Sequence, residues 1–306
     1  MSLRIAIIGA GFIGLNLAEA FLLKGYVVNV LDRGEKPDNL TYSGLSWLQG
    51  DVGDKELVSE LLSQSDIVFY LVSSTVPGDD VDVSKELFLN VSQLIQVLDL
   101  CELYSVKKFI FFSSSSVYGA QTVVPISESC VPLPISAHGV QKLTMEYYIG
   151  LFSRRSDTDC NIVRLSNPFG PGQNIHGRQG FISIVIGHLK QVSSVNIRGS
   201  GDDVRDYIYI DDVVDACQLL MTSESKQLVF NMGCGLGYSL NDVIGIFEQQ
   251  LGYTLPVLHT KCRESDIPVS VLDLSKMNNE FGFNPRVSLA SGIKKFLIYH
   301  NVLPDV

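Results

Sequence analysis

The stretch LRIAIIGAGFIG at residues 3–14 decides the fold of this 306-residue chain. Its first six residues form a short apolar run that stops at a glycine, which is typical of a buried β-strand. Residues 15–24 then place apolar side chains at helical spacing, and Gly25 can end that helix. A tight glycine loop of the form G-x-G-x-x-G separates the two elements, and it consists of Gly9, Gly11 and Gly14. Such a loop allows close packing of helix on strand and close approach of the backbone to a pyrophosphate.

The same alternation of strand and helix continues to about residue 166. Apolar strand candidates lie at residues 26–31, 46–49, 67–72, 109–113 and 161–165, and helical patterns lie at residues 55–62, 84–104 and 139–155. Continuous apolar strands joined by helices predict an α/β fold, with a doubly wound parallel sheet covered on both faces. After residue 166 the sequence changes to glycine- and proline-rich loops with short elements between them. We therefore expect a first domain at residues 1–166 and a smaller α/β lobe at residues 167–306, partly interleaved with it.

Composition excludes several classes of protein. Apolar residues make up 46% of the chain and charged residues 18%, which is incompatible with disorder. Lys and Arg number 23 against 33 Asp and Glu, and the net charge of −10 argues against a nucleic-acid or anionic-membrane surface. The absence of a long apolar run and of a signal peptide predicts a cytoplasmic protein. The six cysteines lie singly, which is typical of reduced thiols, and the histidines have no metal-ligand spacing, so no metal is expected.

The glycine loop and the acids behind it predict a dinucleotide site. Asp32 ends the second strand, 18 residues after Gly14, where a carboxylate can bind the ribose diol of an adenosine. An acid at this point disfavours a 2′-phosphate, so we expect NAD and not NADP, although the adjacent Arg33 weakens that preference. Asp51 and Val52 follow the third strand, with Asp51 placed to reach the adenine edge. The alternative is an ordinary strand–helix turn with a surface aspartate.

Longer motifs occur further along the chain, each with its own spacing. They are KKFIFFSSSSVYG at residues 107–119, RLSNPFGPGQ at 164–173, GSGDDVRDYIYIDD at 199–212, NMG at 231–233, RESD at 263–266 and FGFNP at 281–285. In this order they resemble the motifs of the extended short-chain dehydrogenase/reductase family, the nucleotide-sugar epimerases and dehydratases. The resemblance covers essentially the whole chain. It implies a Rossmann sheet that binds NAD and a second lobe that binds a nucleotide sugar.

Two positions depart from the family's patterns. The first glycine of the family's Gly-x-x-Gly-x-x-Gly is Ile8 here, and we expect Gly9 to take over the turn with altered loop geometry. The family's catalytic Tyr-x-x-x-Lys aligns with HGVQK at residues 138–142, so His138 stands where the tyrosine belongs. Gly139 and Lys142 fit the family pattern, and they fix the register.

The resemblance implies roles for three residues at the reacting sugar. In the family, a tyrosinate takes a proton from a sugar hydroxyl while a hydride passes from the same carbon to NAD, and the lysine, here Lys142, binds the nicotinamide ribose. Ser114 aligns with the hydroxyl that hydrogen-bonds the reacting oxygen. His138 can serve as the base, because an imidazole has an ordinary pKa of about 6.5 and nearby positive charge favours its neutral form. Imidazole is shorter than phenol by roughly 1–2 Å, so the alternative is a non-catalytic His138 in a protein that still binds nucleotide sugar.

The hydroxyls of Ser114–Ser116 bear on the type of reaction. The 4,6-dehydratases of the family carry an acid pair at these positions, and a carboxylate is missing here. A 4-epimerase needs no such acid, because the same hydride leaves and returns on the opposite face of a rotated keto sugar. The alternative for the serine run is local capping of the strand end.

Further residues are assigned to the ligands by the resemblance. Arg205 and Arg263 can give charge-assisted hydrogen bonds to a pyrophosphate, whereas the alternative for Arg205 is a structural pair with Asp206 or Asp212. The remaining assignments are Asn167, Phe181 and Asp266 on the substrate side, and Phe12, Ile13, Leu71 and Pro168 on the cofactor side.

Together these features predict an NAD-dependent epimerase that acts at C4 of a UDP-hexose or UDP-N-acetylhexosamine through a 4-keto intermediate. A C4 ketoreductase, which consumes its cofactor, is one alternative. A non-catalytic NAD and nucleotide-sugar binding protein is the other. The resemblance also implies a homodimer formed through the helices at residues 84–104 and 139–155, although burial within the monomer would explain their apolar stripes equally well.

Overall fold

The structure is a computed structural model that describes residues 3–73, 83–177, 179–225, 227–261 and 267–304. The chain divides into two compact units, and each is built from three separate segments. Unit 1 consists of Met1–Val117, Ser136–Arg164 and Cys217–Phe230, and unit 2 consists of Tyr118–Ile135, Leu165–Ala216 and Asn231–Val306. In the part of the chain described, no helix combines the length and the apolar character needed to cross a membrane.

Unit 1 is built on a seven-stranded sheet with the order β10-β6-β5-β4-β1-β2-β3. The strands are β1 (Arg4–Ile8), β2 (Val27–Asp32), β3 (Leu45–Gln49), β4 (Ile67–Tyr70), β5 (Lys108–Ser114), β6 (Asp159–Leu165) and β10 (Val229–Met232). Strand β1 pairs in parallel with β2 on one side and with β4 on the other. The winding therefore reverses at β1, which makes the sheet doubly wound, and the predicted α/β fold is confirmed.

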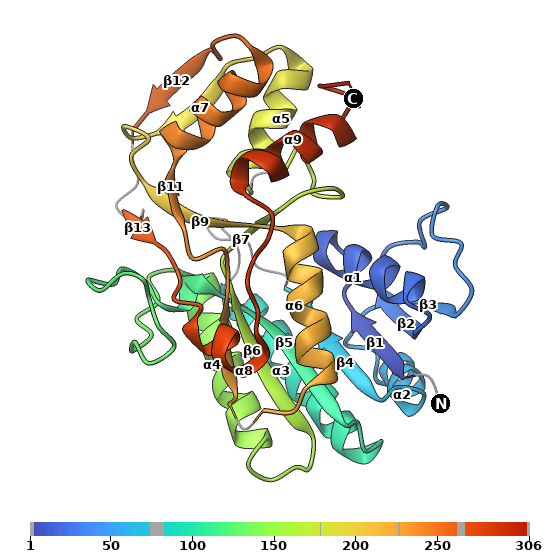
Figure 1. Cartoon of the computed structure of the whole chain (residues 1–306). Helices are drawn as coiled ribbons and strands as arrows, with labels where there is room; N and C mark the ends of the chain where they lie inside the picture. The colour runs from blue at the N-terminus through green and yellow to red at the C-terminus, as the bar shows by residue number, and fades with distance from the viewer. Residues whose placement is uncertain (1–2, 74–82, 178, 226, 262–266, 305–306) are drawn as a thin grey trace. The chain divides into compact units, whose positions relative to one another are not determined.

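Helices cover both faces of this sheet because successive side chains of each strand point to opposite faces. On one face Phe21 of α1 (Phe12–Leu23) packs on Phe69 of β4, with ring centroids 5.4 Å apart. On the other face α2 (Lys55–Ser63), α3 (Val83–Leu103) and α4 (Ala137–Phe152) join one buried apolar cluster with Ala6 and Ile8 of β1. Helices α3 and α4 run alongside each other (Figure 1).

Unit 2 contains smaller sheets and four helices of its own among the described residues. In its main sheet β9 (Val204–Tyr209) pairs with β7 (Asn167–Phe169), β11 (Gly237–Ser239) and β13 (Val269–Ser270), and β8 (Val195–Arg198) pairs separately with β12 (Val257–Thr260). The helices are α5 (Phe181–Gln191), α7 (Leu240–Leu251), α8 (Ser275–Phe281) and α9 (Leu289–Tyr299). A further helix, α6 (Ile210–Thr222), begins in unit 2, and its residues from Cys217 onward belong to unit 1.

The elements predicted from the sequence in the first half are all present, with shifts at their ends. Helix α1 begins at Phe12, three residues earlier than its apolar spacing indicated, because Gly11 is already its N-cap. Strand β4 ends at Tyr70 and not at residue 72, and helix α4 ends at Phe152 and not at residue 155.

Candidate functional site

The glycine loop at the carboxyl end of β1 is shaped by contacts that exclude side chains. Gly9 has a φ of +98°, and its N–H donates to the carbonyl of Leu31 over 2.9 Å. A Cβ on Gly14 would lie 2.1 Å from the Gly9 carbonyl oxygen, so α1 can approach the strand this closely only with glycine there. Ile8 remains an ordinary strand residue of β1. Gly9 therefore makes the turn.

Gly11 differs from its neighbours because space is open around it. Apart from the residues next to it in the chain, no atom of the described residues lies within 4 Å of the position that a Cβ on Gly11 would take, and Gly11 is the N-cap of α1 without a side-chain cap hydrogen bond. The first turn of α1, which includes Phe12 and Ile13, holds no acidic residue. Open space at the positive end of a helix dipole is a suitable place for a phosphate anion. The loop therefore fits the pyrophosphate of a dinucleotide.

Asp32 is held next to this loop at the end of β2. Its Oδ2 accepts a hydrogen bond from the backbone N–H of Ala10 over 2.6 Å, and its Oδ1 accepts one from the N–H of Gly34 over 2.7 Å. The neighbouring Arg33 side chain is exposed. These bonds fix the carboxylate where the sequence predicts contact with a ribose, and that contact stays a prediction.

The other residues assigned to the cofactor in unit 1 follow β3 and β4. The exposed Asp51 accepts hydrogen bonds from the N–H of Gly53 over 2.8 Å and from Nε2 of Gln93 over 3.0 Å. Val52 is buried, and the N–H of Leu71 donates to the carbonyl of Ile8 over 2.9 Å. The structure thus brings the glycine loop and the cofactor residues of unit 1 to the carboxyl ends of β1 to β4, whereas Pro168 lies on β7 in unit 2.

Ser114 ends β5, and a short 3-10 turn at Ser115–Val117 follows it. Its Oγ accepts a hydrogen bond from the backbone N–H of Ser116 over 3.1 Å. Local capping therefore occurs at Ser114. A hydroxyl that accepts from a backbone N–H still has a proton to donate, so capping and contact with a substrate oxygen are compatible.

Lys142 lies on the inward face of α4 and is only 5% exposed. Its Nζ donates to the carbonyl oxygen of Phe112 over 2.8 Å and lies 4.8 Å from the ring centroid of Phe111. Burial lowers the pKa of Lys142 to about 8, and the negative charge of Glu146 opposes this by raising it. The ammonium group is thus anchored at the carboxyl end of β5.

His138 lies one helical turn before Lys142, in the first turn of α4. Ser136 caps this helix, and its Oγ accepts the N–H of Gly139 over 3.1 Å. The histidine is half-buried. Its role as a base stays a prediction.

A buried charged group on the same helix was missed by the sequence reasoning. Glu146 and Arg164 are both about 5% exposed, and Arg164 donates from Nη2 to Oε2 of Glu146 over 2.6 Å and from Nε over 3.1 Å to Oε1. Ser113 also donates its hydroxyl to Oε1 of Glu146. The signal that could have revealed the pair is a Glu four residues after Lys142 on the inward face of α4, and an Arg inside the apolar strand β6.

Arg205 lies on β9 in unit 2, and the acid beside it is Asp203, not the expected Asp206 or Asp212. Its Nη1 donates to the carbonyl of Val204 over 2.9 Å, and its Nη2 lies 3.8 Å from Oδ2 of Asp203. The two acids that were expected as partners accept backbone N–H groups instead: Asp206 from Cys234, Gly235 and Leu272, and Asp212 from Arg286 and Val287. Asp206 is fully buried, which raises the pKa of its carboxyl group.

Of the remaining residues assigned to the substrate, Asn167 and Phe181 lie in the described part of the chain. Asn167 on β7 donates its Nδ2 to the carbonyl of Asp206 over 2.8 Å, and Phe181 is the first residue of α5. Arg263 and Asp266 lie outside the described residues.

The fold and the loop together define a class of protein. A doubly wound sheet with an open glycine turn after β1 and a fixed acid at the end of β2 is a dinucleotide-binding arrangement.

Comparison with known proteins gives the family. Residues 5–233 match the model of the NAD dependent epimerase/dehydratase family. The putative UDP-glucose 4-epimerase of Methanocaldococcus jannaschii is 30% identical, and 94% of each chain is covered. The dTDP-4-dehydro-6-deoxyglucose reductase of Escherichia coli is 29% identical, also with 94% of each chain covered. The crystal structure of UDP-glucose 4-epimerase from Thermotoga maritima superposes with a TM-score of 0.92 at 30% identity, covering 98% of this chain and 99% of that one. The chain belongs to the NAD dependent epimerase/dehydratase family, and NAD is its cofactor.

Proposed function

We propose that the protein is an NAD-dependent 4-epimerase of a nucleotide sugar, a UDP-hexose or a UDP-N-acetylhexosamine. The observation that carries this proposal is the arrangement at the carboxyl end of β5. There Lys142 is bound to the carbonyl of Phe112, two residues before Ser114, and His138 lies one turn earlier on the same helix. The putative UDP-glucose 4-epimerase of M. jannaschii and the UDP-glucose 4-epimerase of T. maritima, both 30% identical, support the choice of substrate.

Each of these residues has a defined task in the reaction. The imidazole of His138 takes the proton of the C4 hydroxyl, and the hydroxyl of Ser114 donates a hydrogen bond to the same oxygen. Lys142 holds the nicotinamide ribose. Bound NAD supplies a hydride acceptor that is regenerated in each turnover. After the keto sugar has rotated, His138 returns the proton, and C4 has the opposite configuration.

The groups at the end of β5 favour epimerisation over dehydration. Elimination of water from the sugar requires a general acid for the departing hydroxyl. Ser114, Ser115 and Ser116 supply hydroxyl groups only, with an ordinary pKa far too high for that task.

A C4 ketoreductase is the second candidate, and the E. coli reductase supports it. The same residues would then deliver a proton to a keto oxygen, and the reduced cofactor would be consumed. The two activities differ in stoichiometry, because only a reductase shows a net change in absorbance at 340 nm with each sugar converted.

A nuclear magnetic resonance assay tests the proposal. The purified protein is incubated with NAD and, in turn, with UDP-glucose, UDP-galactose and both N-acetyl analogues. We expect interconversion by the wild type and a loss of about 10²-fold or more in the His138→Ala variant, since general-base catalysis contributes on this order. The matched control is His259→Ala, which changes an exposed histidine on β12 in unit 2 and should leave the rate unchanged.

Other outcomes contradict the proposal in distinct ways. Conversion to a dehydrated keto sugar would make the protein a dehydratase. Binding of NAD and sugar without conversion, with activity gained only in His138→Tyr, would make it a binding protein in which His138 is not catalytic.

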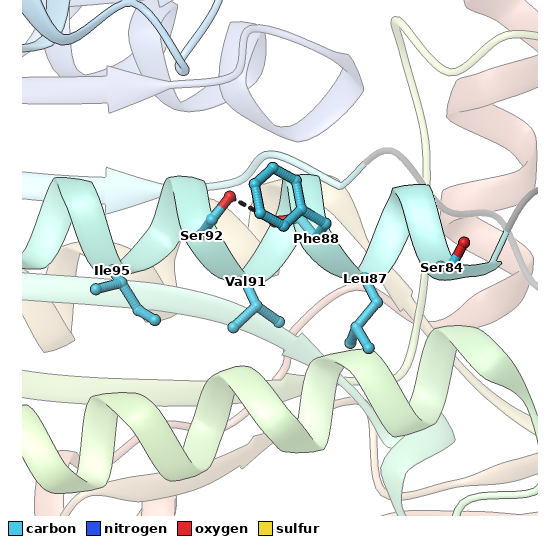
Figure 2. A pocket seen from close by; sticks show the side chains of 6 residues that line it. All are labelled: Ser84, Leu87, Phe88, Val91, Ser92 and Ile95. Carbon is cyan, nitrogen blue, oxygen red and sulfur yellow. Dashed lines mark hydrogen bonds between the residues drawn. The ribbon is translucent and has the colours of Figure 1, made fainter.

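A homodimer formed through α3 and α4 is part of the same proposal. An apolar hollow on α3 is lined by Ser84, Leu87, Phe88, Val91, Ser92 and Ile95, and Figure 2 shows Leu87, Val91 and Ile95 in one row along the helix. Phe88 is 70% exposed, and on the adjacent α4 Tyr147 is 66% exposed. Two neighbouring helices that both expose large apolar side chains offer a surface that a second copy can cover symmetrically, so that four helices meet.

A further inference from the structure

Both carboxylate oxygens of Glu146 accept hydrogen bonds from side chains of unit 1. Besides the 2.6 Å bond from Nη2, Nε of Arg164 lies 3.1 Å from Oε1 and 3.2 Å from Oε2. The hydroxyl of Ser113 donates to Oε1 as well. This geometry is the two-pronged pairing of a guanidinium with a carboxylate, which fixes orientation as well as distance.

The group connects α4 to the strand that ends in Ser114. Glu146 binds the side chain of Ser113, and Lys142, one turn earlier on α4, binds the carbonyl of Phe112. Two consecutive residues of β5 are therefore attached to two consecutive inward positions of α4. His138 continues the same helical row by one more turn, because positions four apart share a face.

A contribution to folding stability does not by itself explain the buried ion pair of Glu146 and Arg164. Removing two charges from water is costly, and a buried ion pair can often be replaced by apolar side chains with no loss of stability. Glu146 is also the charge that opposes the effect of burial on the pKa of Lys142, which burial lowers to about 8. Arg164, on β6, is the other charged group at this carboxylate.

We propose that Glu146 is a positioning residue, which, clamped by Arg164, holds Ser113 and so keeps β5 and α4 aligned for Ser114 and His138 to face the same sugar oxygen. This inference rests on the proposed epimerase reaction. Glu146 itself touches neither substrate nor cofactor.

The experiment compares three changes to this group. Ser113→Ala removes the bond to β5 and leaves the ion pair. Glu146→Gln removes the charge and keeps an acceptor for Ser113. The double variant Glu146→Leu/Arg164→Met replaces the ion pair with apolar side chains, so that neither partner of the pair is left buried without the other even if Glu146→Gln fails to fold.

We expect kcat to fall by about 10-fold or more in Ser113→Ala and on the order of 10²-fold in the double variant, because displacements near 1 Å at a reacting centre have such effects. KM for the nucleotide sugar and the melting temperature should stay close to the wild-type values in both. In Glu146→Gln, which removes the negative charge and keeps Arg164, the pH at which NAD affinity declines through loss of the Lys142 proton should move to lower values. The sign follows from the loss of a negative charge that stabilises the ammonium ion.

Asp66→Asn is the matched control, since Asp66 accepts from Arg4 over 3.1 Å at the other end of the sheet, where β1 and β4 begin. It removes an ion pair of unit 1 and should leave kcat and the pH dependence unchanged.

A double variant with wild-type kcat would overturn the inference and leave the ion pair a purely structural role. If the wild type converts none of the four nucleotide sugars, the epimerase proposal fails separately. In that case the pH dependence of NAD affinity tests the role of Glu146. If NAD affinity declines at the same midpoint pH in the wild type and in Glu146→Gln, the positioning role of Glu146 is overturned.

Discussion

Gly11 and Gly14 stand three positions apart in the first loop but have opposite surroundings. A Cβ on Gly14 would meet the Gly9 carbonyl oxygen at 2.1 Å, whereas a Cβ on Gly11 would meet nothing within 4 Å in the part of the chain that the structure describes, its own chain neighbours apart. Gly14 is therefore required by the packing of the protein itself. Gly11 is required only if a ligand fills the open space beside it.

This difference predicts two separate phenotypes. Gly14→Ala should destabilise the protein by about 1–3 kcal/mol, as over-packing does, and lower its melting temperature. Gly11→Ala should keep the melting temperature of the NAD-depleted protein and weaken NAD binding at least about 10-fold, because the methyl group takes the space of a phosphate. Calorimetry without and with NAD measures both effects.

Gly245→Ala is the control for these variants. Gly245 is an exposed residue inside α7 with open space around it, so alanine there should raise stability by about 0.5–1 kcal/mol and leave NAD affinity unchanged. Full NAD affinity in Gly11→Ala would show that the phosphates lie elsewhere.

At the scale of elements, the alternation of strands and helices could be predicted from the sequence because its signals are local. The apolar run of β1, the glycines behind it and the helical spacing of α1 all lie within about two dozen residues. The Glu146 group could not be predicted in this way. Glu146 is 33 positions from Ser113 and 18 from Arg164, and the three meet only because β5 lies next to β6 and α4 covers both.

The hydrogen-bond partners of buried polar side chains could not be predicted from the sequence either. Asp206 follows Arg205 directly on β9 and Asp212 lies seven positions after Arg205, yet each aspartate accepts backbone N–H groups from distant segments. Sequence proximity suggested ion pairs because it contains no information about which backbone groups arrive from elsewhere. The roles of Ser114, His138 and Asn167 toward ligands stay predictions, since they concern molecules outside the chain.

The exposed apolar side chains of α3 and α4 predict a dimer interface that a single substitution can test. Phe88→Glu places a charge where a second copy would cover an apolar residue, so the dimer should dissociate into monomers at micromolar concentration. Light scattering after size-exclusion chromatography measures the mass. Leu258→Glu, an exposed apolar position on β12 in unit 2, is the control and should leave the dimer intact. A Phe88→Glu protein that stays dimeric would place the interface on another surface.

At the scale of the whole molecule, the residues proposed for the two ligands are divided between the two units. Those for NAD lie mainly in unit 1, at the ends of β1 to β4, and Arg205 and Asn167 lie in unit 2. Binding of the nucleotide and binding of NAD should therefore respond to different substitutions.

Arg205→Gln tests this division. Charge-assisted hydrogen bonds contribute about 1.5–3 kcal/mol, so the affinity for UDP should fall roughly 10- to 100-fold, while NAD affinity stays constant. Titration calorimetry with each ligand measures both. Arg198→Gln, an exposed arginine at the end of β8, is the matched control. Unchanged UDP affinity in Arg205→Gln would exclude Arg205 from the nucleotide site.

The interleaving of the chain has a consequence for its synthesis. The sheet of unit 1 is bordered by β10, whose residues Val229–Met232 leave the ribosome only after Leu165–Ala216 of unit 2 have been made. Until then β6, which is buried along most of its length in the finished protein, is paired with β5 alone and has one open edge. Such an edge is where nascent chains pair wrongly with one another. The growing polypeptide thus passes through a long interval in which its largest sheet is open to misassembly, and chaperones that shield exposed strands would act in that interval.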